Sequence, residues 1–121
     1  MRLFHLVSPE VWRGALADGS YRPPSLDTEG FVHFSFVEQV AATANLVYRH
    51  ELDLVAVEID SGDVDGALKI EDSYDSGTRF PHVYGAIPVE AAVTVHSLER
   101  AESGDWTFSP DGASAAASPD R

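Results

Sequence analysis

The sequence contains no cysteine, which excludes disulfides, thiolate nucleophiles and cysteine metal sites. Any catalysis must therefore come from histidine, tyrosine, serine, arginine or carboxylate side chains. The sequence also lacks an apolar run of about 18 residues, and its start lacks the basic and apolar regions of a signal peptide. The opening MRLFHLV is typical of a first strand instead. These absences predict a cytoplasmic protein without a membrane partner.

Basic residues are scarce, since 8 Lys and Arg stand against 20 Asp and Glu and give a net charge of -12. Such a field repels polyphosphate backbones, so nucleic acid is not expected as a partner, and the charge chiefly favours solubility. An anionic ligand would need a local arginine, and Arg22 and Arg79 are the best candidates because they fall in predicted loops. The motifs G-x-G-x-x-G, P-loop, G-x-S-x-G and H-E-x-x-H are all missing.

What is present indicates one globular domain over residues 1–110, because 44% of the 121 residues are hydrophobic and 23% are charged. Residues 111–121 carry no large apolar side chain and are predicted to form a disordered tail. About six strands and two helices are expected, and they do not alternate strictly. This order predicts an α+β fold with an antiparallel or mixed sheet. The clearest strands are expected at 2–7, 31–34, 52–60, 67–72 and 91–99.

Two helices have start signals in the sequence. In the first, Ser8 is the expected N-cap, Pro9 the first helical residue and Gly19 the terminator. The second is expected to start with an S-x-x-E capping box at residues 35–38 and to run to about His50. The expected inward face of this second helix consists of Phe36, Val40, Ala44 and Val47. Between the helices, residues 21–30 are predicted to be a binding loop.

Three histidines are the main candidates for a site. His5 and His33 lie inside predicted strands among apolar neighbours, where burial favours the neutral imidazole. His82 lies between Pro81 and Gly85 in a stiff segment. The alternative is that each ring satisfies backbone groups in the core, or that His82 faces solvent. We predict that His5, His33 and His82 line one shared pocket. His50 and His96 are expected to be structural.

Other sites were weighed against these residues. No short H-x-H or H-x-x-x-H spacing supports a zinc site, so no metal is expected. Ser35 is explained as a helix cap, although a ligand anion could also sit beside that helix start. Acidic residues at strand ends could form a paired-carboxylate site, but such residues are usually solvated; these are Glu58, Asp60, Glu71 and Asp72.

Several segments in order resemble one family. They are FHLV, GSYRPPSL at 19–26, GFVHFS followed by Glu38-Gln39-Val40, LDLVAVEID, and FPHVYGAIPVEAAV. In this order and spacing they resemble the domain-of-unknown-function 952 (DUF952) family over roughly residues 2–110. That family is similar to a compact ADP-ribosyltransferase fold, and the strand order is similar to the catalytic half of RNA 2′-phosphotransferases.

The resemblance implies NAD as a substrate and a small-molecule or nucleotide ligand. It implies that His5 and His33 hold the ribose, that Ser35 matches a small hydroxyl residue, and that His82 acts in proton transfer. Further contacts are expected from an aromatic stacked on nicotinamide and an arginine on phosphate; these are Tyr21, Phe80 or Tyr84, and Arg22. The segment FPHVYG lacks the glutamate of the third ADP-ribosyltransferase motif. Two hypotheses follow, an ADP-ribosyl transferase or glycohydrolase, and a non-enzymatic binding module.

Overall fold

The computed structural model describes residues 1–110, and the predicted tail lies outside them. The helices are α1 (Pro9–Asp18), α2 (Pro24–Thr28) and α3 (Val40–Val47), with single 3₁₀ turns at Val37–Gln39, Ser61–Asp63 and Val89–Ala91. The strands are β1 (Arg2–Val7), β2 (Ser20–Tyr21), β3 (Val32–His33), β4 (Val55–Asp60), β5 (Ala67–Glu71), β6 (Phe80–Tyr84), β7 (Ile87–Pro88), β8 (Ala92–Ser97), β9 (Glu99–Arg100) and β10 (Trp106–Thr107).

The strands form two three-stranded sheets, ordered β1-β4-β8 and β3-β6-β5, and two small pairs, β2-β7 and β9-β10. All pairings between strands within residues 1–110 are antiparallel. The predicted α+β class with antiparallel strands is confirmed. There are more strands and helices than the six and two expected, because the added elements are mostly two-residue strands and the short α2, which leave little periodicity in a sequence.

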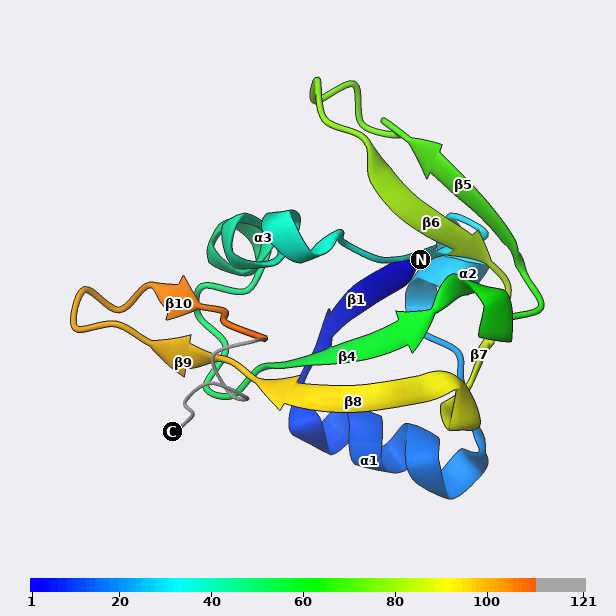
Figure 1. Cartoon of the computed structure of the whole chain (residues 1–121), viewed down its shortest axis with the longest axis horizontal. Coiled ribbons are helices and arrows are strands. Elements are labelled where there is room, and N and C mark those ends of the chain that lie inside the picture. Colours follow the sequence, from blue (N-terminus) through cyan, green and yellow to red (C-terminus); the bar gives the residue numbers. More distant parts are fainter. Residues whose placement is uncertain (111–121) are drawn as a thin grey trace.

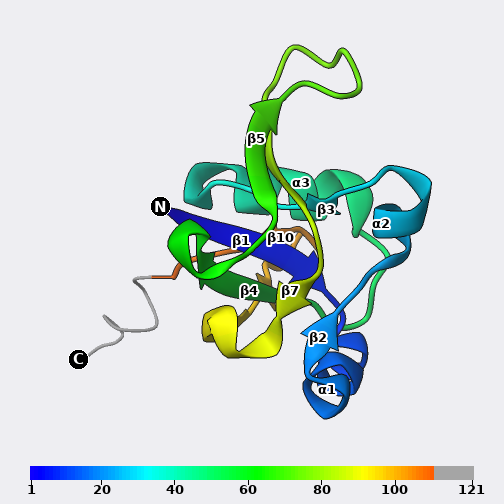
Figure 2. The same ribbon diagram turned by 90° about the vertical axis from the view of Figure 1, so that its right-hand side faces the viewer.

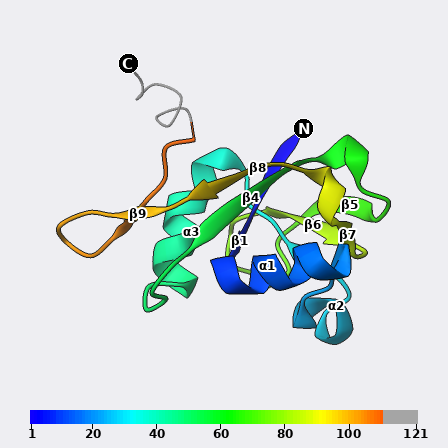
Figure 3. The same cartoon turned by 90° about the horizontal axis from the view of Figure 1, so that it is seen from below.

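The β1-β4-β8 sheet is covered on both faces: Figure 1 shows α1 below it and α3 above, and Figure 3, seen from below, shows α1 in front of the strands. Leu3 and Val7 of β1 pack in one core cluster with Trp12 of α1, whereas Phe4 and Leu6 pack in another cluster with α3. Alternate residues of a strand point to opposite faces, so both faces being buried explains the nearly continuous apolar run. His5 shares the face of Leu3 and Val7, as its position predicts.

The β5-β6 hairpin projects away from the β1-β4-β8 sheet, and Figure 2 shows its connecting loop at the tip. β6 is the central strand of its sheet, and its residues 81–83 are buried. β5 is more exposed, with no buried residue along its length. The hairpin therefore has one buried strand and one exposed strand, and its loop extends beyond the body of the protein.

The caps of α1 are confirmed. The Ser8 hydroxyl accepts a hydrogen bond from the Val11 amide, and Gly19 ends the helix in the left-handed conformation at φ 84°. Only glycine adopts this conformation without a steric cost.

The Ser35 cap is wrong. The Ser35 backbone pairs with Phe4 of β1 in a β-bridge, so the chain is still extended at that residue. The helical turn starts after Phe36, whose amide donates to the side chain of Gln39. Of the expected inward face, Val40 and Ala44 are buried, whereas Val47 is 60% exposed because α3 ends there.

Two other boundaries differ from the prediction. The expected loop at 21–30 contains α2, which begins directly after Pro23 with Pro24 in its first turn. The strand predicted from Leu52 begins only at Val55, and Leu52 is 92% exposed. The alternation of apolar and polar residues continues back to Leu52, but neither β1 nor β8 pairs with the chain before Val55. No helix within residues 1–110 is long and apolar enough to cross a membrane.

Candidate functional site

A cleft of about 280 Å³ opens between α3, the end of β3 and the β5-β6 hairpin. Leu46 and Val47 of α3 form one wall, and residues of the hairpin loop form the opposite one. The three predicted histidines all line it. Five aromatic side chains also line it, namely Phe4, Phe34, Tyr48, Tyr74 and Phe80. The cleft is thus mostly apolar, with imidazoles as its principal polar groups.

His5 has both ring nitrogens occupied. Its Nδ1 donates to the backbone carbonyl of His33 at 2.5 Å, and its Nε2 accepts from the Tyr21 hydroxyl at 2.7 Å. Burial lowers the pKa of His5 to about 4, so the ring is neutral at pH 7. Burial also raises the pKa of Tyr21, which keeps its hydroxyl a donor. His5 therefore positions β3 and Tyr21 rather than offering a free nitrogen to a ligand.

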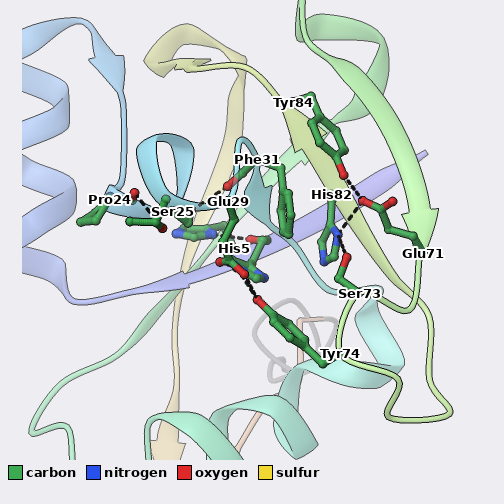
Figure 4. Close-up of polar contacts among 12 residues, drawn as sticks. His5, Pro24, Ser25, Glu29, Phe31, Glu71, Ser73, Tyr74, His82 and Tyr84 are labelled. Carbon is green, nitrogen blue, oxygen red and sulfur yellow. Dashed lines mark hydrogen bonds and ion pairs between the residues drawn. The ribbon is translucent and has the colours of Figure 1, made fainter.

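His33 is held by a carboxylate from its own segment. Its Nε2 lies 2.7 Å from Oε1 of Glu29, four residues earlier. The Tyr74 hydroxyl donates to the other oxygen of Glu29 and lies 3.2 Å from His33 Nε2 (Figure 4). The hydrogen bonds from Tyr74 and then His33 lower the pKa of Glu29, so it is ionised. His33 Nε2 is then the protonated nitrogen, and Nδ1 has no hydrogen-bond partner among residues 1–110.

His82 is the most buried of the three, with 1% of its surface exposed. Its Nδ1 lies 3.0 Å from Oε2 of Glu71 and 3.3 Å from the Ser73 hydroxyl, as Figure 4 shows. The Tyr84 hydroxyl donates to the same carboxylate oxygen. Because Glu71 and Ser73 share one nitrogen, they do not flank the ring as in a Ser-His-acid triad. The Nε2 of His82 has no partner in the described part of the chain.

The environment keeps His82 neutral. Burial lowers its pKa, and this outweighs the opposing effect of the hydrogen bond that His82 donates to Glu71. The Phe31 ring stacks on the imidazole at a centroid distance of 4.0 Å. Glu71 is ionised because the hydrogen bonds from Tyr84 and His82 lower its pKa. With Nδ1–H held by a carboxylate, Nε2 carries a lone pair that can accept a proton.

Sheet register brings His33 and His82 together. They are direct partners in the β3-β6 pairing, and their ring centroids are 5.1 Å apart. Two carboxylate–imidazole pairs, Glu29–His33 and Glu71–His82, thus meet at one cleft. Ser35 is 4% exposed and also lines the cleft, and its hydroxyl has no hydrogen-bond partner within residues 1–110.

Of the other residues predicted to contact a ligand, some line the cleft and others do not. Phe80 lines the cleft, whereas Tyr21 lines an adjoining hollow of about 340 Å³ that shares His5 and His33 with it. Tyr84 does not line the cleft, since its hydroxyl is directed to Glu71 and its ring lies under Lys69. Arg22 is exposed and does not line the cleft; it lies with α1 on a surface next to the adjoining hollow. The contacts of Tyr84 and Arg22 with a ligand stay predictions, and both residues lie outside the cleft lining.

Sequence reasoning missed the groups that hold the histidines. Glu29 could have been noticed because it precedes His33 by four residues, but the segment was expected to be a loop without helical spacing. Glu71 was weighed as part of a paired-carboxylate site, but a solvated strand end was preferred. Its role depends on the pairing of β5 with β6, which no local pattern predicts. Within residues 1–110 no group of three or more His, Asp or Glu side chains is arranged to hold a metal ion.

Comparison with known proteins gives a family and two structures of one relative. The crystal structure of protein CC0527 from Caulobacter crescentus has a TM-score of 0.78 and 27% sequence identity, and the match covers 88% of this chain and 94% of that chain. The solution NMR structure of CC0527 has a TM-score of 0.73 and 26% identity over 93% and 94% of the two chains. The search of curated proteins finds no match. A family model described as a protein of unknown function (DUF952) matches residues 6–95, and the chain belongs to this family.

Proposed function

We propose that the protein binds the nicotinamide-ribose end of NAD or a related ADP-ribose compound and cleaves or transfers it at the N-glycosidic bond. The ADP-ribosyltransferase-like architecture suggested by the sequence resemblance is part of this proposal. The observation that carries it is the Glu71–His82 pair. It presents a neutral imidazole with an unpartnered Nε2 at an apolar cleft.

The chemistry follows from this pair. His82 Nε2 accepts a proton from water, or from the hydroxyl of an acceptor, as its oxygen attacks the ribose carbon. The bond from that carbon to the pyridinium nitrogen breaks, and its electron pair stays on nicotinamide, which leaves uncharged. The transition state is cationic at the ribose carbon. The carboxylates of Glu29 and Glu71, placed behind the two imidazoles, stabilise this positive charge.

The cleft also suits the ligand in size and lining. Its volume of about 280 Å³ is at the lower end for small-molecule sites and fits a ring with its ribose rather than a whole dinucleotide. The diphosphate and the rest of the ligand would remain outside the cleft and outside the adjoining hollow of about 340 Å³, because the linings of both contain no lysine or arginine among residues 1–110. Ser35 offers a buried hydroxyl to a sugar hydroxyl group.

A second function is a binding module without turnover, and one observation favours it. Both carboxylates already accept hydrogen bonds from tyrosines, Glu29 from Tyr74 and Glu71 from Tyr84. Neither is therefore a free catalytic glutamate of the kind that the resemblance would require. In this case the cleft would bind its ligand and release it unchanged.

The experiment is titration calorimetry with NAD and ADP-ribose, followed by chromatography for released nicotinamide. We expect binding at millimolar ligand or below, nicotinamide release by the unaltered protein, and loss of release in His82→Gln. His96→Gln is the matched control, because His96 also pairs with a glutamate but does not line the cleft. Binding without release supports the binding module. No binding of either ligand refutes both functions.

A further inference from the structure

We propose that the cleft selects cationic ring or quaternary ammonium ligands over neutral and anionic ligands of the same shape. The inference rests on the proposed function only in taking the cleft as the ligand site. It names the charge class of the ligand, which the histidine pairs alone do not.

The first observation is the density of aromatic rings around the opening. Phe34, Tyr48, Tyr74 and Phe80 line the cleft from four separate segments. The faces of aromatic rings are electronegative and attract cations, and several rings around one site are a recurring way to bind quaternary ammonium groups. An apolar ligand without charge would gain contact area here but not this attraction.

The second observation is the charge around the cleft. No lysine or arginine within residues 1–110 lines the cleft or the adjoining hollow. The carboxylates of Glu29 and Glu71 are hydrogen-bonded to His33 and His82, which line the cleft, and Glu51 lines the hollow. Burial lowers the pKa of His5 and of His82, so these rings add no positive charge at pH 7.

These observations act in the same direction. A cation in the cleft is lined by aromatic rings and by two histidines that are each hydrogen-bonded to a carboxylate, and the net charge of -12 attracts it from solution. An anion meets the same groups without a cationic partner. A phosphate group would therefore have to remain outside both hollows, in solvent.

Three probes of one ring test the inference, namely 1-methylnicotinamide (a cation), nicotinamide (neutral) and nicotinate (an anion). Affinities are measured by NMR chemical-shift titration at low ionic strength and pH 7.5. We expect the cation to bind about 10-fold more tightly than nicotinate, with nicotinamide between them. Salt should reduce this ratio, because it screens the carboxylates. The resonances of His33, His82 and Tyr74 should shift.

Phe80→Leu is the variant that tests the aromatic contribution, because it keeps an apolar side chain but removes a ring from the lining. We expect it to weaken binding of 1-methylnicotinamide about 3- to 10-fold and that of nicotinamide less. Phe36→Leu is the matched control, since Phe36 is a half-buried phenylalanine that packs on the core outside the cleft lining. Equal losses for cation and neutral ring in Phe80→Leu argue against an aromatic cation site.

The outcomes separate this inference from the proposed function. If nicotinate binds as tightly as 1-methylnicotinamide, cation selection is refuted, even if nicotinamide is released from NAD. If the cation is preferred but NAD is neither bound nor cleaved, the proposed reaction fails and the selection stands. If none of the three probes binds, cation selection is refuted, and the proposed reaction is decided by the experiment with NAD and ADP-ribose.

Discussion

The two sheets each contain a histidine–glutamate pair across neighbouring antiparallel strands. In β1-β4-β8, His96 Nε2 lies 2.7 Å from Glu58, and in β3-β6-β5, His82 Nδ1 lies 3.0 Å from Glu71. Their surroundings differ. His96 packs against Phe4 and does not line the cleft, whereas the His82 ring stacks on Phe31 and lines the cleft.

The difference teaches that the pair itself does not make a site. Glu58 is also within 3.4 Å of Arg2, so the first pair belongs to a surface charge cluster. Glu71 is bound by the neutral hydroxyl of Tyr84 instead. What distinguishes the second pair is the burial of its histidine, since 2% of the His82 side chain is exposed against 13% for His96, beside a cleft that can admit a ligand. Burial and access, rather than residue identity, separate the two histidines.

The largest expected effect is on turnover. His82→Gln should lower the rate of nicotinamide release about 100-fold or more, because it removes the proton acceptor. His96→Gln should leave the rate within about twofold. The two rates are compared in the same single-turnover assay, with folding checked by circular dichroism. Similar losses in both variants would mean that the pairs do not differ in role.

The next effect is on stability and concerns His5, which is buried and belongs to the same sheet as His96. Its pKa of about 4 lies below the unfolded value of 6.5, so the unfolded chain binds the proton more readily. The stabilising contribution is complete above pH 6.5 and is lost as the pH falls toward 4, by roughly 3 kcal/mol.

Urea unfolding between pH 7 and pH 4 measures this loss. His5→Gln should have a lower free energy of unfolding at pH 7 but a shallower dependence on pH than the unaltered protein. His50→Gln is the control, since His50 is exposed. An unchanged slope in His5→Gln would contradict the prediction.

A smaller effect is expected from the carboxylates. Glu71→Gln should lower kcat about 10-fold, because the imidazolium that forms during proton transfer loses its counter-charge. The hydrogen bond that His82 donates to the Glu71 carboxylate raises the pKa of His82, so the loss of this carboxylate should lower that pKa further. The acid limb of the pH-rate profile, where His82 gains a proton, should then move to lower pH. Glu58→Gln should not move it, which distinguishes positioning from a general structural effect.

The smallest effect is expected from the group behind each carboxylate. Tyr84→Phe should lower kcat two- to fivefold and destabilise the fold by about 1 kcal/mol, because Glu71 loses one hydrogen bond. Arg2→Gln, which removes the neighbour of Glu58, should leave kcat unchanged and alter stability by less than about 1 kcal/mol, since that ion pair is exposed. Equal kinetic effects would remove the distinction between the sheets.

Features of the fold that depend on residues close together in the sequence were predicted, and features that depend on distant residues were not. The boundaries of α1 were predicted because Ser8 and Gly19 act within one helical turn. The placement of His5 was predicted because β1 alternates regularly. The start of the second helical segment was missed because the pairing of Ser35 with Phe4, 31 positions earlier, overrides a local capping pattern.

The candidate site was predictable to the same extent. His5, His33 and His82 could be selected because titratable rings in apolar strands need partners. The partners themselves, Glu71 and Tyr74, could not, because both approach through the pairing and the loop of a hairpin.

The sequence by itself determined the class of the fold, the ends of its first helix and the three rings that required an explanation. These depend on residue spacing and on capping groups that act over a few positions. Only the tertiary structure decided which rings share a cleft, which nitrogen of each is occupied, and that Arg22 and Tyr84 lie outside the cleft lining. The physical reason is that burial and hydrogen-bond partners are supplied by segments distant along the chain.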